Sequence, residues 1–134
     1  MVGQMSEAFN LELASSLASY SVDIHSFKDR FDVDQSRITL IDKALLNHET
    51  HRLTDISKMI KIDGSEDSKQ FSFAGKILEE FAHLQLKRGE IINVVGGGSI
   101  QDVATVATSL YMRWIEWNYF PTTLASMMDS CIGG

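Results

Sequence analysis

Short apolar runs alternate along the chain with longer segments in which apolar residues recur every three or four positions. Short β-branched runs are typical of strands, and the wider spacing is typical of amphipathic helices. Their alternation predicts an α/β fold with a mostly parallel sheet. We expect strands at residues 10–15, 20–25, 37–42, 57–63, 91–95 and 116–120, the first two forming an antiparallel pair at the N-terminal edge of a sheet.

The helical pattern is clearest over residues 71–88. Lys87, Arg88 and Gly89 predict the end of this helix, because cations interact favourably with the C-terminal end of a helix and glycine readily adopts the left-handed conformation that caps it. One face of the helix is apolar and is expected to pack on the sheet. Its members are Phe73, Ala74, Ile77, Leu78, Phe81 and Leu84.

Further helices are predicted at residues 44–53, at residues 99–113, and after Pro121 through Met128. For the last of these, the hydroxyl of Thr122 or Thr123 can accept a hydrogen bond from an N–H group of the first turn. The apolar face predicted for residues 99–113 consists of Ile100, Val103, Ala104, Ala107, Leu110 and Tyr111.

The strongest local signal is the turn Gly96-Gly97-Gly98, which follows the apolar strand IINVV and precedes a helix that begins SIQD. Glycines allow backbone N–H groups to approach a phosphate at the positive N-terminus of a helix. The turn lacks the G-x-G-x-x-G spacing of the ordinary dinucleotide motif. The alternative is a tight strand-to-helix turn with Ser99 and Asp102 as a capping box, and the two roles can coexist.

Composition places the chain among ordinary globular proteins. Its 134 residues favour one domain, since domains commonly contain about 100–200 residues, and its 44% hydrophobic content argues against disorder. No apolar run reaches the roughly 18–20 residues of a membrane span, and the N-terminus lacks the pattern of a secretory signal, so a cytoplasmic protein is expected. A formal net charge of -6 argues against a nucleic-acid surface.

Metal binding is not indicated by the cysteine and histidine pattern. His48 and His51 are three positions apart on either side of Glu49, whereas the zinc-protease helix requires histidines four positions apart. Cys131 is the single cysteine, so neither an internal disulfide nor a multi-thiolate site can form within one chain. No metal ligands are assigned.

The run GGGSIQDVATVATSLYMR, continued by YFPTTLASMMDSCIGG, resembles the N-terminal domain of 3-dehydroquinate synthase and the related sugar-phosphate cyclases. Upstream, GSEDSK is similar to the family's G-E-x-x-K segment, and ITLID is similar to a strand that ends in an NAD-binding aspartate. The resemblance implies a single Rossmann-like, NAD-binding domain over residues 1–134.

NAD contacts are implied wherever the sequence matches the family's motifs. On the adenosine side, where carboxylates suit ribose hydroxyls, the matching residues are Asp42, Glu66 and Lys69. At the pyrophosphate and the neighbouring ribose they are Gly97, Gly98, Ser99 and Asp102, and the family's Pro-Thr-Thr segment at NAD supplies Thr122 and Thr123.

Two further matches concern the substrate. Asp129 matches an aspartate near the nicotinamide and the substrate, and Arg113 matches an arginine that meets the substrate phosphate, in some members across a dimer. The implied reaction is a carbon–oxygen lyase step of the shikimate pathway to aromatic amino acids, the cyclisation of a phosphorylated seven-carbon sugar acid with elimination of phosphate. NAD transiently oxidises a hydroxyl in this reaction, and a zinc or cobalt ion polarises the oxygen.

The resemblance also implies that part of the enzyme is missing. The family's metal ligands lie in a helical C-terminal domain that this chain does not contain, and the lysine that follows the family's Gly-Gly would come directly after Gly134. We therefore expect a truncated domain that binds NAD but no metal and does not complete the reaction alone. Its expected protein partner is the missing catalytic domain or a second copy.

Two positions depart from the family pattern. The family usually has glycine where this chain has Trp114, after the substrate arginine, and it often has glycine at the position of Gln101. Trp114 adds a large ring where the backbone turns towards the substrate. We expect it to perturb the substrate end more than the NAD end.

Two other functions compete with this interpretation. The glycerol dehydrogenases and related metal-dependent alcohol dehydrogenases share a GGGS-x-x-D turn, so the chain could be a fragment of such an oxidoreductase. It could also be a stand-alone nucleotide-binding or protein-interaction module that uses the apolar last third as an interface, since only Asp102, Arg113, Glu116 and Asp129 are charged after Glu90.

Overall fold

The computed structural model describes residues 9–14, 19–24, 33–47, 56–64 and 71–130. The chain divides into two compact units, Met1–Val33 and Asp34–Gly134. In the first unit, strands β1 (Phe9–Ala14) and β2 (Ser19–Ile24) pair antiparallel. This confirms the predicted antiparallel pair, which forms a two-stranded sheet of its own.

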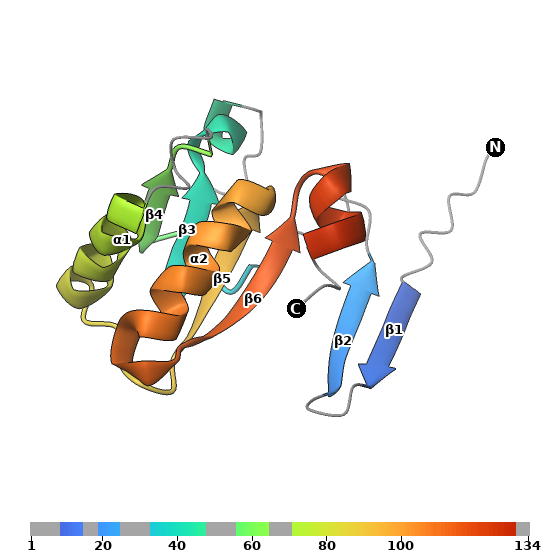
Figure 1. Ribbon diagram of the computed structural model, residues 1–134, viewed down its shortest axis with the longest axis horizontal. Helices are drawn as coiled ribbons and strands as arrows, with labels where there is room; N and C mark the ends of the chain where they lie inside the picture. Colours follow the sequence, from blue (N-terminus) through green and yellow to red (C-terminus); the bar gives the residue numbers. More distant parts are fainter. Residues whose placement is uncertain (1–8, 15–18, 25–32, 48–55, 65–70, 131–134) are drawn as a thin grey trace. The chain divides into compact units, whose positions relative to one another are not determined.

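The second unit is built on a parallel sheet of four strands in the order β4-β3-β5-β6 (Figure 1). The strands are β3 (Thr39–Asp42), β4 (Met59–Ile62), β5 (Ile91–Gly96) and β6 (Glu116–Pro121). All three neighbouring pairs are parallel. The predicted α/β fold with a mostly parallel sheet is therefore confirmed.

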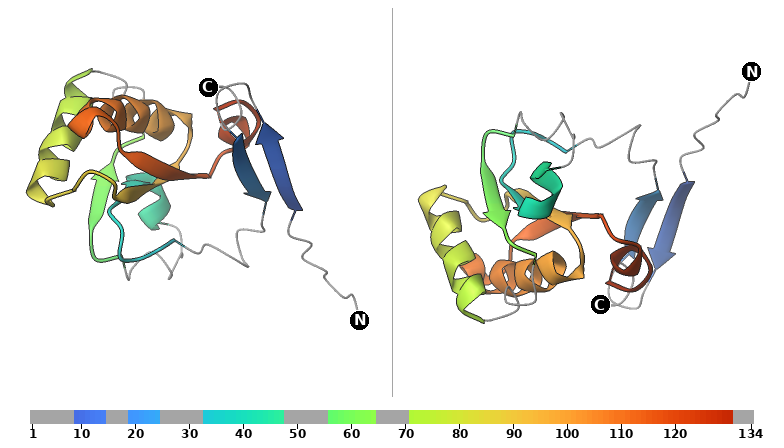
Figure 2. Two further views of the ribbon diagram at one scale, coloured as in Figure 1. Left: turned by 90° about the horizontal axis from the view of Figure 1, so that it is seen from below. Right: turned by 90° about the horizontal axis from the view of Figure 1, so that it is seen from above.

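Helices α1 (Phe71–His83) and α2 (Gly98–Leu110) lie on one face of this sheet, and the short 3-10 helix η1 (Lys43–Asn47) lies on the other (Figure 2). Parallel crossovers are right-handed, so a chain that moves outward from β3 to β4 and then back across to β5 must place its two connections on opposite faces. The helix predicted at residues 44–53 is thus present as η1 in its first part, and residues 48–53 lie outside the described residues.

The core lies between the sheet and the two helices. β5 supplies Ile92 and Val94, which are fully buried, as expected for the central strand of a covered parallel sheet. The predicted apolar face of α1 is confirmed by burial of Ala74, Ile77 and Phe81, and full burial of a side chain as large as Phe81 stabilises the fold by about 1.5–3 kcal/mol. The predicted face of α2 is confirmed with one exception, because Leu110 is 53% exposed.

Polar side chains are buried on the opposite face of the sheet, beside Ile41 and Val95. Thr39 and Asn93 are register partners on β3 and β5. The Asn93 amide Nδ2 donates hydrogen bonds to the Asp34 carbonyl at 3.1 Å and to the Thr39 hydroxyl at 3.4 Å. Asn93 therefore holds the segment that leads into β3.

Helix α1 ends at His83, several residues before the predicted end at Lys87, Arg88 and Gly89. Gln85 adopts a left-handed φ of 54°. The N–H of Leu86 donates to the Phe81 carbonyl at 2.9 Å, and the N–H of Gln85 donates to the Ala82 carbonyl at 3.1 Å. These bonds form a Schellman motif with glutamine at the position that glycine usually occupies. Burial of both Leu86 and Phe81 compensates for the unfavourable φ.

Gly89 also has a left-handed φ, of 88°, but in a different structure. The Glu90 N–H donates to the Lys87 carbonyl at 3.1 Å, and the Lys87 N–H donates to the Glu90 carboxylate at 2.6 Å. Gly89 is thus the third residue of a type II turn that enters β5, where glycine is required. The sequence signal identified the left-handed glycine and assigned it to the wrong element.

The connection from α2 to β6 is strained. Residues Tyr111–Arg113 form a 3-10 turn instead of continuing α2 as predicted for residues 99–113. Met112, Arg113 and Trp114 have φ values of 47°, 69° and 132°. A positive φ in a bulky residue is costly, and the value at Trp114 belongs to a region that only glycine adopts easily.

We expect replacement of Gln85 by glycine to stabilise the fold by about 1 kcal/mol, because glycine removes the steric cost of the left-handed conformation. Thermal unfolding followed by circular dichroism measures the change. The matched control is Gly89→Ala, which places a side chain at a left-handed position and is expected to lower the melting temperature. A Gln85→Gly variant that melts below the wild type would contradict the assignment of this cap.

Trp114→Gly is expected to be more stable than Trp114→Ala by about 1–2 kcal/mol. Both variants remove the indole, which is 58% exposed, but only glycine tolerates the φ of 132° without strain. The comparison therefore isolates the backbone contribution. Urea unfolding of the two variants provides the measurement, and equal midpoints would show that no strain is stored at this position.

Candidate functional site

The strand order creates a switch point between β3 and β5. The chain leaves β3 towards β4 on one side of the sheet and leaves β5 towards β6 on the other. In open parallel sheets, ligands bind in the crevice outside the carboxyl ends of the strands at such a point. Here Asp42 ends β3 and Gly96 ends β5, directly after the register pair Ile41–Val95.

The N-terminus of α2 begins at this switch point. Gly97 is the residue that caps α2, and its carbonyl accepts hydrogen bonds from the N–H groups of Ile100 at 3.1 Å and Gln101 at 3.2 Å. Within the part of the chain that the structure describes, the N–H groups of Gly97, Gly98 and Ser99 donate to no acceptor. These donors lie at the positive end of the helix dipole, where an anion would satisfy them.

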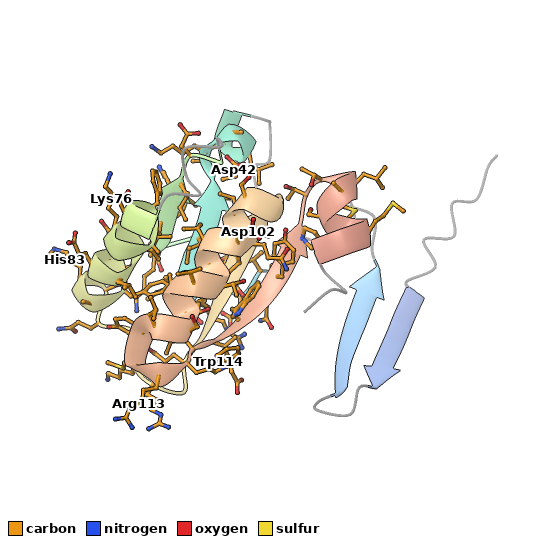
Figure 3. All side chains as sticks on the ribbon, viewed as in Figure 1. Asp42, Lys76, His83, Asp102, Arg113 and Trp114 are labelled. Carbon is orange, nitrogen blue, oxygen red and sulfur yellow. The ribbon has the colours of Figure 1, made fainter. Side chains whose placement is uncertain are left out.

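The capping box considered for Ser99 and Asp102 is wrong. The capping residue is Gly97, which has no side chain, and Ser99 is the second residue of the helix. No side-chain hydrogen bond caps α2. Asp102 is exposed one turn further along α2, near the same end of the sheet as Asp42 (Figure 3). Both side chains are therefore available to a ligand at the switch point.

Packing within the chain itself leaves no room for a side chain at Gly96 and little room at Gly97. A Cβ atom on Gly96 would lie 2.6 Å from Cγ1 of Ile100, which is closer than real Cβ contacts. A Cβ atom on Gly97 would lie 3.1 Å from Cγ2 of Thr123. The glycines let α2 and the end of β6 approach the turn, in addition to leaving its N–H groups open.

The segment after β6 is fastened to the turn. The Gly96 carbonyl accepts hydrogen bonds from the Thr122 N–H at 3.0 Å and from the Tyr119 hydroxyl at 3.1 Å. The Thr123 hydroxyl accepts from the Ser126 N–H at 3.2 Å, and the Ser126 hydroxyl accepts from the Thr123 N–H at 3.3 Å. These reciprocal bonds confirm Thr123, not Thr122, as the cap of the last helix.

Tyr119 and Ser126 were not identified from the sequence. The spacing T-x-x-S from Thr123 to Ser126 was the available signal for the second of them, because it places two hydroxyls at the positions of a capping box. For Tyr119 no local pattern points to the Gly96 carbonyl, which is distant in sequence.

Asp42 is held at the carboxyl end of β3 by a local hydrogen bond. Its Oδ1 atom accepts from the Ala44 N–H at 2.9 Å, which starts helix η1. Asp42 is paired in register with Ile62 on β4, and Gly64 follows two residues later. A Cβ atom on Gly64 would lie 2.9 Å from the Asp42 carboxyl carbon.

The structure brings most of the residues assigned to NAD to one edge of the sheet. They are Asp42, Gly97, Gly98, Ser99, Asp102, Thr122 and Thr123. Glu66 and Lys69 follow β4 in the sequence and lie outside the described residues. Asp129 belongs to the π-helix η4 (Ser126–Ser130), which follows Thr123, and its side chain is also outside the described part.

Arg113 is not part of this cluster. It follows α2 at the other end of the helix, beside Trp114, whereas Asp42 and Asp102 lie at the opposite end of the sheet (Figure 3). A helix of 13 residues is about 20 Å long. A small ligand held at the N-terminus of α2 therefore cannot also contact Arg113 of the same chain.

Two observations concern metals and membranes. Among the residues that the structure describes, no three His, Cys, Asp or Glu side chains gather as metal ligands. Within the same ranges, no helix combines the length and the apolar character needed to cross a bilayer.

Curated relatives of this chain are 3-dehydroquinate synthases. The protein from Methylacidiphilum infernorum is 36% identical over 101 residues, which cover 71% of this chain and 28% of that enzyme. The protein from Clostridium kluyveri is 36% identical over 77 residues, which cover 58% of this chain and 21% of that enzyme. The chain thus spans less than a third of the length of these relatives.

Solved structures of sugar-phosphate cyclases have a similar fold. The 2-epi-5-epi-valiolone synthase ValA from Streptomyces hygroscopicus subsp. jinggangensis 5008, solved with NAD+ and Zn2+, matches 73% of this chain and 29% of its own at a TM-score of 0.66 and 24% identity. A 2-deoxy-scyllo-inosose synthase, solved with carbaglucose-6-phosphate, NAD+ and Co2+, matches 72% of this chain and 29% of its own at a TM-score of 0.58 and 25% identity.

The family model described as 3-dehydroquinate synthase N-terminal matches residues 59–134, which is more than half of the chain. The matched region contains the glycine turn, α2 and the segment fastened to them. The protein therefore belongs to the 3-dehydroquinate synthase N-terminal family.

Proposed function

We propose that this chain is the NAD-binding domain of a 3-dehydroquinate synthase-like lyase. The observation that carries the proposal is the set of N–H groups at Gly97, Gly98 and Ser99. They donate to no acceptor among the described residues, and they lie at the β3/β5 switch point next to Asp42. The pyrophosphate of a dinucleotide suits such donors, and a ribose diol suits a carboxylate. Sugar-phosphate cyclases of similar fold have been solved with NAD+.

Each residue of the edge has a definite role in this proposal. The α2 N-terminus holds the pyrophosphate, Asp102 a neighbouring ribose, and Asp42 the adenosine ribose, with Glu66 and Lys69 on the same side. Thr122 and Thr123 line the nicotinamide side, followed by Asp129 near the substrate. NAD, when bound, supplies the hydride acceptor for transient oxidation of a substrate hydroxyl. The chain itself binds and orients the two molecules.

In this proposal, the complete lyase reaction also requires residues that this chain does not supply. The chain covers 28% of the Methylacidiphilum enzyme, and its described residues present no metal-ligating cluster. Zinc or cobalt would polarise the substrate oxygen from a second, C-terminal domain. The chain alone is therefore expected to bind NAD without turning over a sugar phosphate.

The position of Arg113 supports a second copy of this chain as a further partner. It is exposed at the end of α2 opposite the nucleotide edge, so it can serve a substrate phosphate only at another site. The neighbouring apolar side chains are also exposed: Leu110 by 53%, Met112 by 48% and Trp114 by 58%. Apolar surface around a functional cation is typical of an interface, and it supports a homodimer in which this end of α2 faces the other chain. As an alternative, the same surface supports a protein-interaction module.

Isothermal titration of the 134-residue chain with NAD tests the nucleotide site. We expect a dissociation constant below about 1 mM, competition by inorganic pyrophosphate, and affinity reduced roughly tenfold or more in Asp42→Ala, because a hydrogen bond to a charged group is lost. Glu79→Ala is the matched control, since it removes an exposed carboxylate from α1. Absence of NAD binding at about 1 mM would overturn the proposal and favour the interaction module.

Self-association at the exposed end of α2 is tested by sedimentation velocity over a range of protein concentrations. We expect a dimer in the wild type and a shift to monomer in Leu110→Asp, because a charge at a desolvated apolar contact is strongly unfavourable. Met128→Asp, which changes another exposed apolar side chain near the C-terminus, serves as the control. A monomeric wild type, or equal effects of the two variants, would count against the dimer.

A further inference from the structure

Gly64 is pressed against the carboxylate of Asp42. A Cβ atom on Gly64 would lie 2.9 Å from Cγ and 3.2 Å from Oδ1 of Asp42, and closer still to Oδ2. Real Cβ atoms essentially never approach another heavy atom more closely than 3.0 Å. The absence of a side chain at Gly64 is therefore a condition for the observed position of the Asp42 carboxylate.

The Asp42 carboxylate cannot move away from Gly64 without losing a hydrogen bond. Its Oδ1 atom accepts the hydrogen bond from the Ala44 N–H at 2.9 Å, which fixes the side-chain rotamer and the start of η1. Parallel pairing of Asp42 with Ile62 also fixes the end of β3 relative to the end of β4. A side chain at Gly64 must therefore displace either the carboxylate or the segment after β4.

The backbone at Gly64 does not itself require glycine. Its φ lies outside the left-handed region, which among the described glycines is occupied by Gly89. Alanine can adopt the same conformation without strain. The effect of Gly64→Ala is therefore the effect of the contact with Asp42.

We infer that Gly64 is a positioning residue for Asp42 and, through it, for the ribose of the bound nucleotide. This inference rests on the proposed NAD site. Gly64 contributes no group to the ligand. Its small size leaves the Asp42 carboxylate at the switch point with Oδ1 held by Ala44 and with Oδ2 on the side of Gly64.

Titration of NAD into a set of variants tests the inference. We expect Gly64→Ala to weaken NAD binding roughly tenfold or more, up to the loss caused by Asp42→Ala. Gly75→Ala is the matched control, because it makes the same substitution in α1 where a Cβ atom meets nothing within 4 Å. In the Asp42→Ala background, Gly64→Ala is expected to cause no further loss, since its effect passes through the missing carboxylate.

The amide proton of Ala44 gives a second readout that does not depend on NAD. In Gly64→Ala we expect its NMR resonance to shift and its exchange with solvent to accelerate, because the bond to Asp42 is disturbed, whereas Gly75→Ala leaves both unchanged. If Gly64→Ala does not fold, recovery of the fold in the double variant Asp42→Ala/Gly64→Ala supports the contact. A double variant that also fails to fold contradicts it.

The outcomes separate the two hypotheses. A wild type that does not bind NAD overturns the proposed function and the nucleotide part of this inference, while the Ala44 amide still decides whether Gly64 positions Asp42. A wild type that binds NAD, together with Gly64→Ala behaving like Gly75→Ala, overturns the inference alone. Additive losses in the double variant also overturn it.

Discussion

Parallel pairing of β3 with β5 is the constraint on which the rest of the second unit depends. It places two strands that are distant in sequence side by side, and their connections leave in opposite directions. Asp42 and the glycine turn consequently lie at the same carboxyl edge of the sheet. Burial of Leu40, Ile92 and Val94 beneath the two helices stabilises this pairing through the hydrophobic effect.

The glycine turn combines close packing with open backbone donors among the described residues. A Cβ atom on Gly96 would clash with Ile100, and one on Gly97 would crowd Thr123. Among the described residues, the same turn leaves N–H donors open at the start of α2. The end of β6 is tied to the turn through the Gly96 carbonyl. Backbone that is already held by hydrogen bonds loses less conformational freedom when a ligand binds, which favours affinity.

The two ends of α2 have different surroundings. Its N-terminus lies at the carboxyl edge of the sheet. Its C-terminus is followed by Met112, Arg113 and Trp114, which have positive φ values, and by exposed apolar side chains. Strain is retained in proteins where the surrounding structure and function sustain it. At Trp114 that strain accompanies a side chain that is 58% exposed and that a partner could cover further.

Much of the fold followed from sequence because strand and helix periodicity is local: the six strands, the apolar faces of α1 and α2, and a cap at Thr122 or Thr123 were predicted. The helix ends at His83 and Leu110 were not, because burial of Leu86 and the entry into β6 decide them. The resemblance to the family grouped the glycine turn with Asp42, Thr122 and Thr123 as one candidate site. Only the tertiary structure shows that Arg113 lies away from this candidate site and that Gly64 lies against the Asp42 carboxylate. Strand order and register determine which residues distant in sequence come into contact.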